Sequence, residues 1–181
     1  MKAMALAMLA ACAALCGAVQ QDWPKIVENK VLYADHDFRG KKAPAFFVGK
    51  WINVPEVDRR GKIVLIEFFA TGSDQCEKMV PVLNDFVKKF KDKLIVMAIT
   101  DESADAAQKF VKTSQAEFCV GIDPKHHMMS EIGVKGIPYA ILVSPDDIVR
   151  WQGFTLDADD TLNEKIVQQV IDASAAKPIK R

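Results

Sequence analysis

The feature that most constrains the fold is a buried strand leading directly into a helix with a cysteine in its first turn. Residues 62–70 are apolar and β-prone, and Thr-Gly-Ser-Asp at residues 71–74 breaks this run. Residues 74–90 then place apolar side chains at helical spacing, and Cys76 lies in the first turn. A nearly unbroken apolar strand is typical of a sheet covered on both faces. The pattern therefore predicts an α/β domain.

The rest of the chain alternates between strand and helix patterns. We expect strands at residues 63–70, 94–99, 118–122, 139–143 and 148–152, and helices at residues 74–90, 101–114, 126–132 and 157–173. Aromatic and β-branched residues at 45–57 predict a further strand or hairpin. This order predicts a central mixed sheet with helices on both faces and an N-terminal β extension.

The N-terminus has the pattern of an export signal. Lys2 precedes an apolar stretch, residues 3–15, that is too short for a comfortable membrane span. Small residues at 16–18 predict cleavage after Ala18, whereas Leu-Ala-Ala-Cys ending at Cys12 resembles a lipobox and would tether the chain to a membrane. Either route predicts an exported protein of the periplasm or cell envelope.

These signals divide the chain into four parts. We expect a signal peptide at residues 1–18, an N-terminal extension with little regular structure at 19–44, one domain at 45–174 and a flexible tail at 175–181. The formal net charge of +0 gives no reason to expect a nucleic acid or an anionic membrane surface as partner. We expect a monomer.

After removal of the signal, the remaining cysteines are Cys76 and Cys119. In an oxidising compartment they could form a disulfide. Cys119 lies in the middle of a predicted strand, so simple packing is favoured, but a bridge stays open because it depends on the Cβ geometry.

The run His126-His127-Met128-Met129 carries imidazole and thioether groups that suit copper. Consecutive positions of one short helix cannot all face one ion. We therefore expect the methionines in the core, the histidines on the surface, no metal site and no cofactor.

Three segments together carry a resemblance. They are EFFATGSDQCEKMVP at residues 67–81, residues 118–123 with IGVKGIP at residues 132–138, and ILVSPDDIVRWQG at residues 141–153. In this combination the chain resembles the TlpA/ResA-type branch of the thioredoxin-like superfamily, redoxins that are exported or membrane-tethered. The resemblance implies a thioredoxin-like fold and thiol-disulfide exchange with exported proteins or peptides.

The resemblance also implies where a substrate would bind. Pro138 matches the family's cis-proline, whose loop pairs with the substrate backbone. Ile137 and Pro138 would then face Gly72, Asp74 and Gln75 across the redox site.

The dithiol of such a site is incomplete here. Exchange needs one thiolate to attack and a second thiol to resolve the mixed disulfide. By position the attacker is replaced by Ser73, and Cys76 matches the resolving thiol. A serine hydroxyl cannot form a disulfide but is a good helix N-cap. Capping is therefore the interpretation that we favour for Ser73.

Other positions also differ from the family's pattern. Gly72 and Gln75 stand where the family usually has Trp and Pro, and Met79 replaces a glutamate that tunes the thiols in ResA-like members. Glu67 aligns with the buried carboxylate behind the second cysteine. Inside the sheet its pKa would rise, and it could exchange a proton with Cys76. A glutamate that faces solvent at the strand edge is the alternative.

Three interpretations of Cys76 are open: a packed and inert thiol, a one-cysteine peroxidase, or a disulfide partner of Cys119. Ser73-x-x-Cys76 resembles the Thr/Ser-x-x-Cys of peroxiredoxins, but that pattern also needs a proline where this chain has Phe69 and an arginine where it has Pro138.

We predict an exported thioredoxin-like protein that has lost the dithiol mechanism. Its residual redox chemistry would rest on Cys76, with Ser73 and Glu67 beside it. The rival functions are a non-catalytic module that binds peptides and a one-cysteine peroxidase.

Overall fold

The structure is a computed structural model that describes residues 22–175. The predicted signal peptide, the Cys12 lipobox and residues 176–181 of the predicted tail lie outside the described residues. Among residues 22–175, no helix has both the length and the apolar character needed to cross a membrane.

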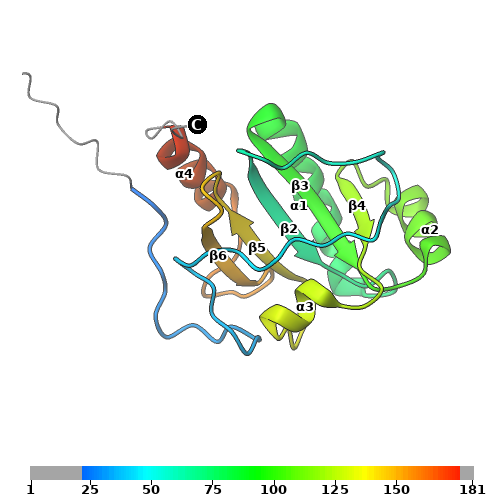
Figure 1. The fold of residues 1–181 in the computed structure, drawn as a ribbon, viewed down its shortest axis with the longest axis horizontal. Coiled ribbons are helices and arrows are strands. Elements are labelled where there is room, and N and C mark those ends of the chain that lie inside the picture. The colour runs from blue at the N-terminus through cyan, green and yellow to red at the C-terminus, as the bar shows by residue number, and fades with distance from the viewer. Residues whose placement is uncertain (1–21, 176–181) are drawn as a thin grey trace, which may run out of the picture.

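A six-stranded sheet in the order β1-β4-β3-β2-β5-β6 forms the centre of the domain. Strands β2, β3 and β4 run parallel to one another, whereas β1, β5 and β6 are antiparallel to their neighbours. The sheet is therefore mixed, as predicted, and Figure 1 shows β6 and β4 toward its two ends. The strands are β1 (Lys50–Trp51), β2 (Ile63–Phe68), β3 (Leu94–Thr100), β4 (Cys119–Ile122), β5 (Tyr139–Val143) and β6 (Val149–Phe154).

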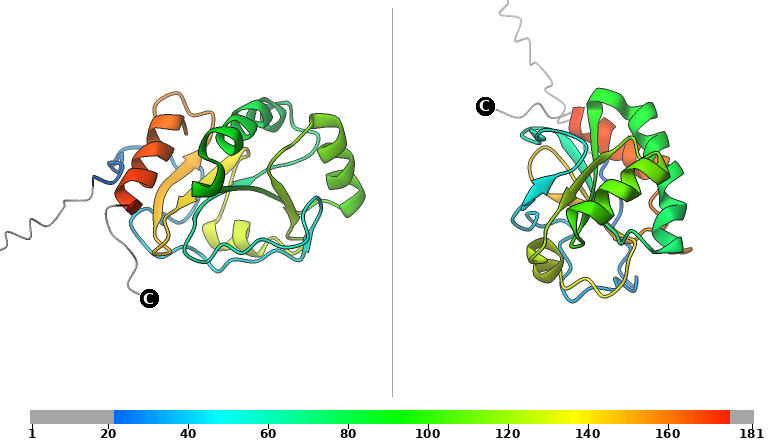
Figure 2. Two further views of the ribbon diagram at one scale, coloured as in Figure 1. Left: turned by 90° about the horizontal axis from the view of Figure 1, so that it is seen from above. Right: turned by 90° about the vertical axis from the view of Figure 1, so that its right-hand side faces the viewer.

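Helices cover both faces of this sheet. The buried side chains of α1, α2 and α4 pack into one core cluster, and those of α3 pack into a second cluster that partly buried residues of the N-terminal segment also contact. In the left view of Figure 2, α1 lies on one side of the sheet and α3 on the other. The helices are α1 (Asp74–Phe90), α2 (Ala104–Ser114), α3 (His127–Ile132) and α4 (Glu164–Ala175), and a 3-10 turn, η1 (Lys91–Lys93), follows α1.

Strand β2 contributes to both cores because its side chains alternate between the faces. Leu65 packs in the cluster with α1, and Val64 and Ile66 pack in the cluster with α3. By the same alternation, Glu67 points to the α1 face.

The strand predicted at residues 45–57 is wrong in extent, since only Lys50 and Trp51 form β1. Asn53 explains why the strand ends there. Its side chain donates to the Phe118 carbonyl oxygen and accepts from the Val120 N–H, each at 2.8 Å. The Asn53 amide thus binds the backbone carbonyl and N–H groups with which a longer β1 would pair.

Two helices begin later than predicted. Helix α2 begins after Ser103, whose hydroxyl accepts the Ala106 N–H at 3.2 Å. Helix α4 begins seven residues after the predicted Asp157, because Asn163 accepts the Ile166 N–H at 3.1 Å in the manner of an N-cap. The intervening loop is held by side-chain contacts to Asp157.

The described part of the N-terminal extension has no helix or strand but is tied to the domain. The Lys30 side chain is 1% exposed, lies 4.2 Å from the Trp151 ring centroid and pairs with Asp160 at 2.7 Å. Isolated β-bridges join Ala34 to Val134, Arg39 to Val149 and Lys42 to Ile148. The extension is therefore held against the domain by these contacts.

Candidate functional site

The loop between β2 and α1 is organised by the cap of the helix. Ser73 is the N-cap with φ −94° and ψ 115°, and its hydroxyl accepts the Cys76 N–H at 3.4 Å. The predicted capping role of Ser73 is thus confirmed. The backbone N–H groups at the start of a helix have no acceptor within the helix. The Ser73 hydroxyl supplies one, so it stabilises the turn that contains Cys76.

Glu102 also stabilises the β2–α1 loop through hydrogen bonds, a role that the sequence did not predict. Its carboxylate accepts the Thr71 N–H at 2.7 Å and the Thr100 hydroxyl at 3.2 Å. One signal could have found it, because Glu102 closely follows the strand β3 that runs parallel to β2. The carboxyl ends of neighbouring parallel strands meet at one edge of a sheet.

The register between β2 and β5 places the proline loop beside the β2–α1 loop. Phe68 pairs with Tyr139 in antiparallel register, so Pro138 lies where the chain leaves β2. The Ile137–Pro138 peptide bond is cis. Ile137 is partly buried and packs against the core cluster that contains Cys76. Thr155 fixes the loop, since its N–H donates to the Pro138 carbonyl oxygen at 3.1 Å.

The surface between these loops is small and polar on one side. Gly72, Asp74 and Gln75 are exposed. A Cβ atom added at Gly72 would meet nothing within 4 Å, so the backbone there does not require glycine. The structure therefore leaves open space beside Gly72.

Cys76 is the thiol of this site, and it is buried. It is 2% exposed, and burial raises its pKa above the ordinary value. The Ser73 hydroxyl and the Ala70 backbone lower this pKa, whereas the carboxylates of Glu67 and Glu102 raise it further. The raised pKa means that the Cys76 thiol is protonated at neutral pH.

Glu67 is buried inside the sheet, so the alternative of a solvent-facing glutamate is wrong. It is 1% exposed, and its Oε2 atom has no hydrogen-bond partner within the described residues. Burial raises the pKa of Glu67 to about 8. At neutral pH the side chain is therefore mostly the neutral acid, which could protonate a Cys76 thiolate when one forms.

The hypothesis of a Cys76–Cys119 disulfide is wrong, because both cysteines are free. Cys76 packs in the α1 cluster and Cys119 against the α3 cluster, so the sheet separates them.

The two histidines face different partners. His126 Nδ1 lies 2.8 Å from Asp101, and His127 Nδ1 lies 2.8 Å from Asp123. Met128 is 1% exposed in the core. Among residues 22–175, no cluster of three or more His, Cys, Asp or Glu side chains could hold a metal ion.

Comparison with known proteins places the chain among redoxins. The model of the AhpC/TSA family matches residues 37–152. Thiol-disulfide oxidoreductase ResA of Bacillus anthracis is 34% identical over 113 residues, which cover 59% of this chain and 64% of the relative. Thiol:disulfide interchange protein CycY of Rhizobium leguminosarum is 25% identical over 120 residues, 66% of this chain and 64% of the relative. The chain thus spans just under two thirds of the length of these relatives.

Solved structures agree on the fold. A putative thiol:disulfide interchange protein DsbE from Chlorobium tepidum has 28% identity and a TM-score of 0.61, with 75% of this chain and 97% of that chain covered. A putative protein disulfide isomerase from Bacteroides thetaiotaomicron has a TM-score of 0.63 at 21% identity and covers 79% of this chain and 91% of its own. The predicted thioredoxin-like fold is confirmed.

Proposed function

Because the chain belongs to the AhpC/TSA family of thioredoxin-like redoxins, we propose that it binds extended segments of exported proteins, carrying thiols or disulfides, without dithiol exchange of its own. The protein would be exported to the periplasm or cell envelope and would act as a monomer through the domain at residues 45–174. Redox chemistry that remains would rest on Cys76, with Glu67 as its proton partner.

One observation carries this proposal: the thiol at the site is buried and protonated, and the position of the attacking thiol is occupied by a helix cap. Cys76 is 2% exposed, and Ser73 uses its hydroxyl to hold the Cys76 N–H. Since the thiolate is the nucleophile in disulfide exchange, neither group can begin the reaction at neutral pH.

The surroundings of Cys76 argue against the one-cysteine peroxidase. A peroxidatic thiol needs a depressed pKa, which a nearby cation supplies. Burial raises the pKa of the Cys76 thiol, the Glu102 carboxylate raises it further, and no cation of the described residues lowers it.

A docking role is supported by the backbone of the proline loop. Ile137 makes no backbone hydrogen bond to another described residue. The register of β2 with β5 brings the proline loop to the end of β2, where the loop with the exposed Gly72 begins. An extended segment could pair with this free N–H and C=O as an added strand does.

The proposal predicts slow alkylation of Cys76. With Cys119→Ser as background, the rate of labelling by iodoacetamide should show its midpoint above that of a free cysteine, which is about 8.5, because burial and neighbouring carboxylates disfavour the thiolate. The measurement is the labelling rate from pH 6 to pH 10, and labelling in denaturant gives the rate of the exposed thiol. A midpoint near 7 would restore the redox function as the main one.

The docking half is tested by NMR. A capped, extended peptide with one cysteine should shift the backbone amides of Gly72, Gln75 and Ile137, because these groups border the site. The amide of Lys109, an exposed residue of α2, serves as the distant control. Shifts spread evenly over the domain, or none at all, would contradict docking at this site.

A further inference from the structure

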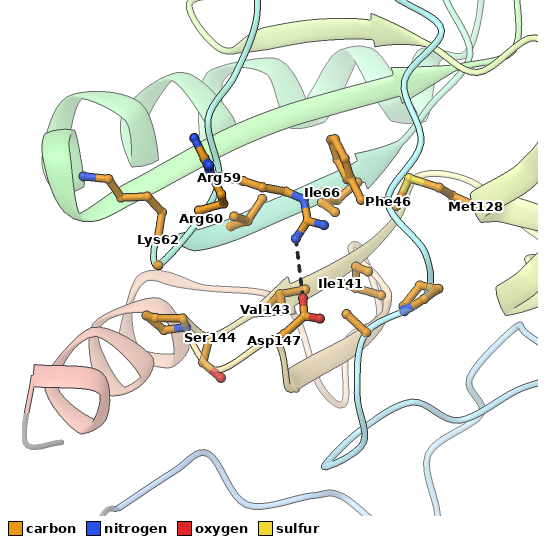
Figure 3. A pocket seen from close by; sticks show the side chains of 15 residues that line it. Phe46, Arg59, Arg60, Lys62, Ile66, Met128, Ile141, Val143, Ser144 and Asp147 are labelled. Atoms are coloured by element: carbon orange, nitrogen blue, oxygen red, sulfur yellow. Dashed lines mark hydrogen bonds and ion pairs between the residues drawn. The ribbon is translucent and has the colours of Figure 1, made fainter. Parts of the chain in front are cut away.

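A cavity of about 310 Å³ lies on the face of the sheet away from Cys76. It opens between strands β2 and β5, the N-terminal segment around Phe46, the loop before β2 and the turn after β5. Figure 3 shows the side chains of these elements around one hollow, with Arg59 reaching across it. The redox-type site described above uses the other face of β2, so the cavity is separate from it.

The floor of the cavity is apolar. Strands β2 and β5 supply four aliphatic side chains on one face of the sheet, and an aromatic ring and a thioether lie at the sides. These residues are Val64, Ile66, Ile141, Val143, Phe46 and Met128. These six side chains belong to the core cluster on the α3 face or pack against it. An apolar floor favours a ligand with an apolar body, because burial removes that body from water.

The mouth of the cavity is cationic. Arg59, Arg60 and Lys62 line it, against the single carboxylate of Asp147. Arg60 is engaged elsewhere, since its guanidinium binds Asp58 with two bonds of 2.8 and 3.0 Å. Lys62 is exposed and makes no ion pair with another described residue.

Arg59 is the group best placed to receive an anion. Its guanidinium carbon lies 4.6 Å from the Phe46 ring centroid, which fixes its position over the apolar floor. Its contact with Asp147 is 3.4 Å long, whereas charge-assisted hydrogen bonds are typically about 2.7–2.9 Å. A ligand carboxylate could therefore make a shorter contact than the one that Asp147 makes.

We propose that this cavity binds a small anionic amphiphile, in which a carboxylate contacts Arg59 and a short alkyl chain or single ring covers the apolar floor. The size supports a small ligand, because ligand sites span roughly 300 to 1,000 Å³ and this one lies at the lower end. The excess of positive charge at the mouth of the cavity favours a negatively charged head group.

The test is isothermal titration calorimetry of the full-length mature protein with octanoate, octan-1-ol and octyltrimethylammonium. Octanoate should bind, and the neutral and cationic probes should bind at least about tenfold more weakly, since a charge-assisted contact is lost. Arg59→Gln should weaken octanoate about tenfold, while Lys109→Gln, an exposed cation of α2, should leave it unchanged.

A second variant tests the floor independently of charge. Ala43→Phe places a ring in the cavity from the N-terminal segment and should abolish octanoate binding, with folding checked by circular dichroism. Equal binding of all three probes, no binding of octanoate, or an unchanged affinity in Arg59→Gln would overturn the proposal. Since none of these residues borders Cys76, failure here leaves the proposed docking function untouched.

Discussion

Ser73→Cys is expected to give this protein a disulfide reductase activity at least tenfold above that of the unmodified chain. Position 73 is the N-cap of the helix α1, where the free N–H groups and the helix dipole stabilise a thiolate. A thiol of a Cys-x-x-Cys motif with pKa near 7 is about half ionised at neutral pH. Burial raises the pKa of Cys76, so this thiol stays protonated at neutral pH.

The measurement is the reduction of insulin disulfides with a chemical reductant as electron source. The cap is weakened at the same time, so Ser73→Cys should also lower the free energy of unfolding by about 1 kcal/mol. Ser73→Ala is the matched control, because it loses the same cap without adding a thiol. It should show the background rate of the unmodified chain.

A double variant separates attack from resolution. Ser73→Cys combined with Cys76→Ser should accumulate a mixed disulfide with its substrate, because the attacking thiol is present and the resolving thiol is gone. If Ser73→Cys alone were no faster than Ser73→Ala, the surrounding loop could no longer support exchange. Ser73 would then not be the only feature of the loop that prevents exchange.

Much of the domain could be predicted from its sequence because the strong signals are local. The apolar run of β2 and the helical stripe of α1 are long and periodic, and both elements lie within two residues of the predicted bounds. The start of α4 could not be predicted from its amphipathic pattern alone. The side chains of Asp157 and Asn163 accept the backbone hydrogen bonds that decide where that helix begins, and these bonds depend on the conformation of the loop.

The site shows the same division between local and long-range information. The cap at Ser73 is a local motif and could be predicted with its mechanism. The sequence alone does not decide whether Glu67 is buried, because one polar residue in an apolar strand does not reveal whether a helix covers the face on which it lies. Likewise, the contact of Glu102 with Thr71 joins residues 31 positions apart, and only the sheet order places them together.

Glu67→Gln is expected to make stability less sensitive to pH, with a growing advantage over the unmodified chain as the pH rises. Burial raises the pKa of Glu67 to about 8 in the folded state, against about 4.3 in the unfolded chain. Between these pH values the folded state keeps a proton that the unfolded state releases. The free energy of unfolding therefore falls as the pH rises from about 4.3 to about 8.

The slope for one such proton is about 1.4 kcal/mol per pH unit, so the full penalty is on the order of 4–5 kcal/mol at pH 9. Urea denaturation of both proteins at pH 5, 7 and 9 measures it. The result is how the difference in free energy of unfolding between the two proteins changes with pH. Its absolute size is not used, because the buried amide of the variant adds a cost that does not depend on pH. Glu77→Gln, at an exposed position in α1, is the matched control and should give parallel curves.

Parallel curves for Glu67→Gln would mean that Glu67 is ionised throughout this range and that a group on the α1 face stabilises its charge. If the stability curves of Glu67→Gln and the unmodified chain diverge as the pH rises, Glu67 is a neutral carboxylic acid behind Cys76 at physiological pH. Such an acid raises no electrostatic barrier to a thiolate beside it, and it can protonate one. It would then give the chain a proton donor behind Cys76, while Ser73 at the start of α1 acts as a helix cap.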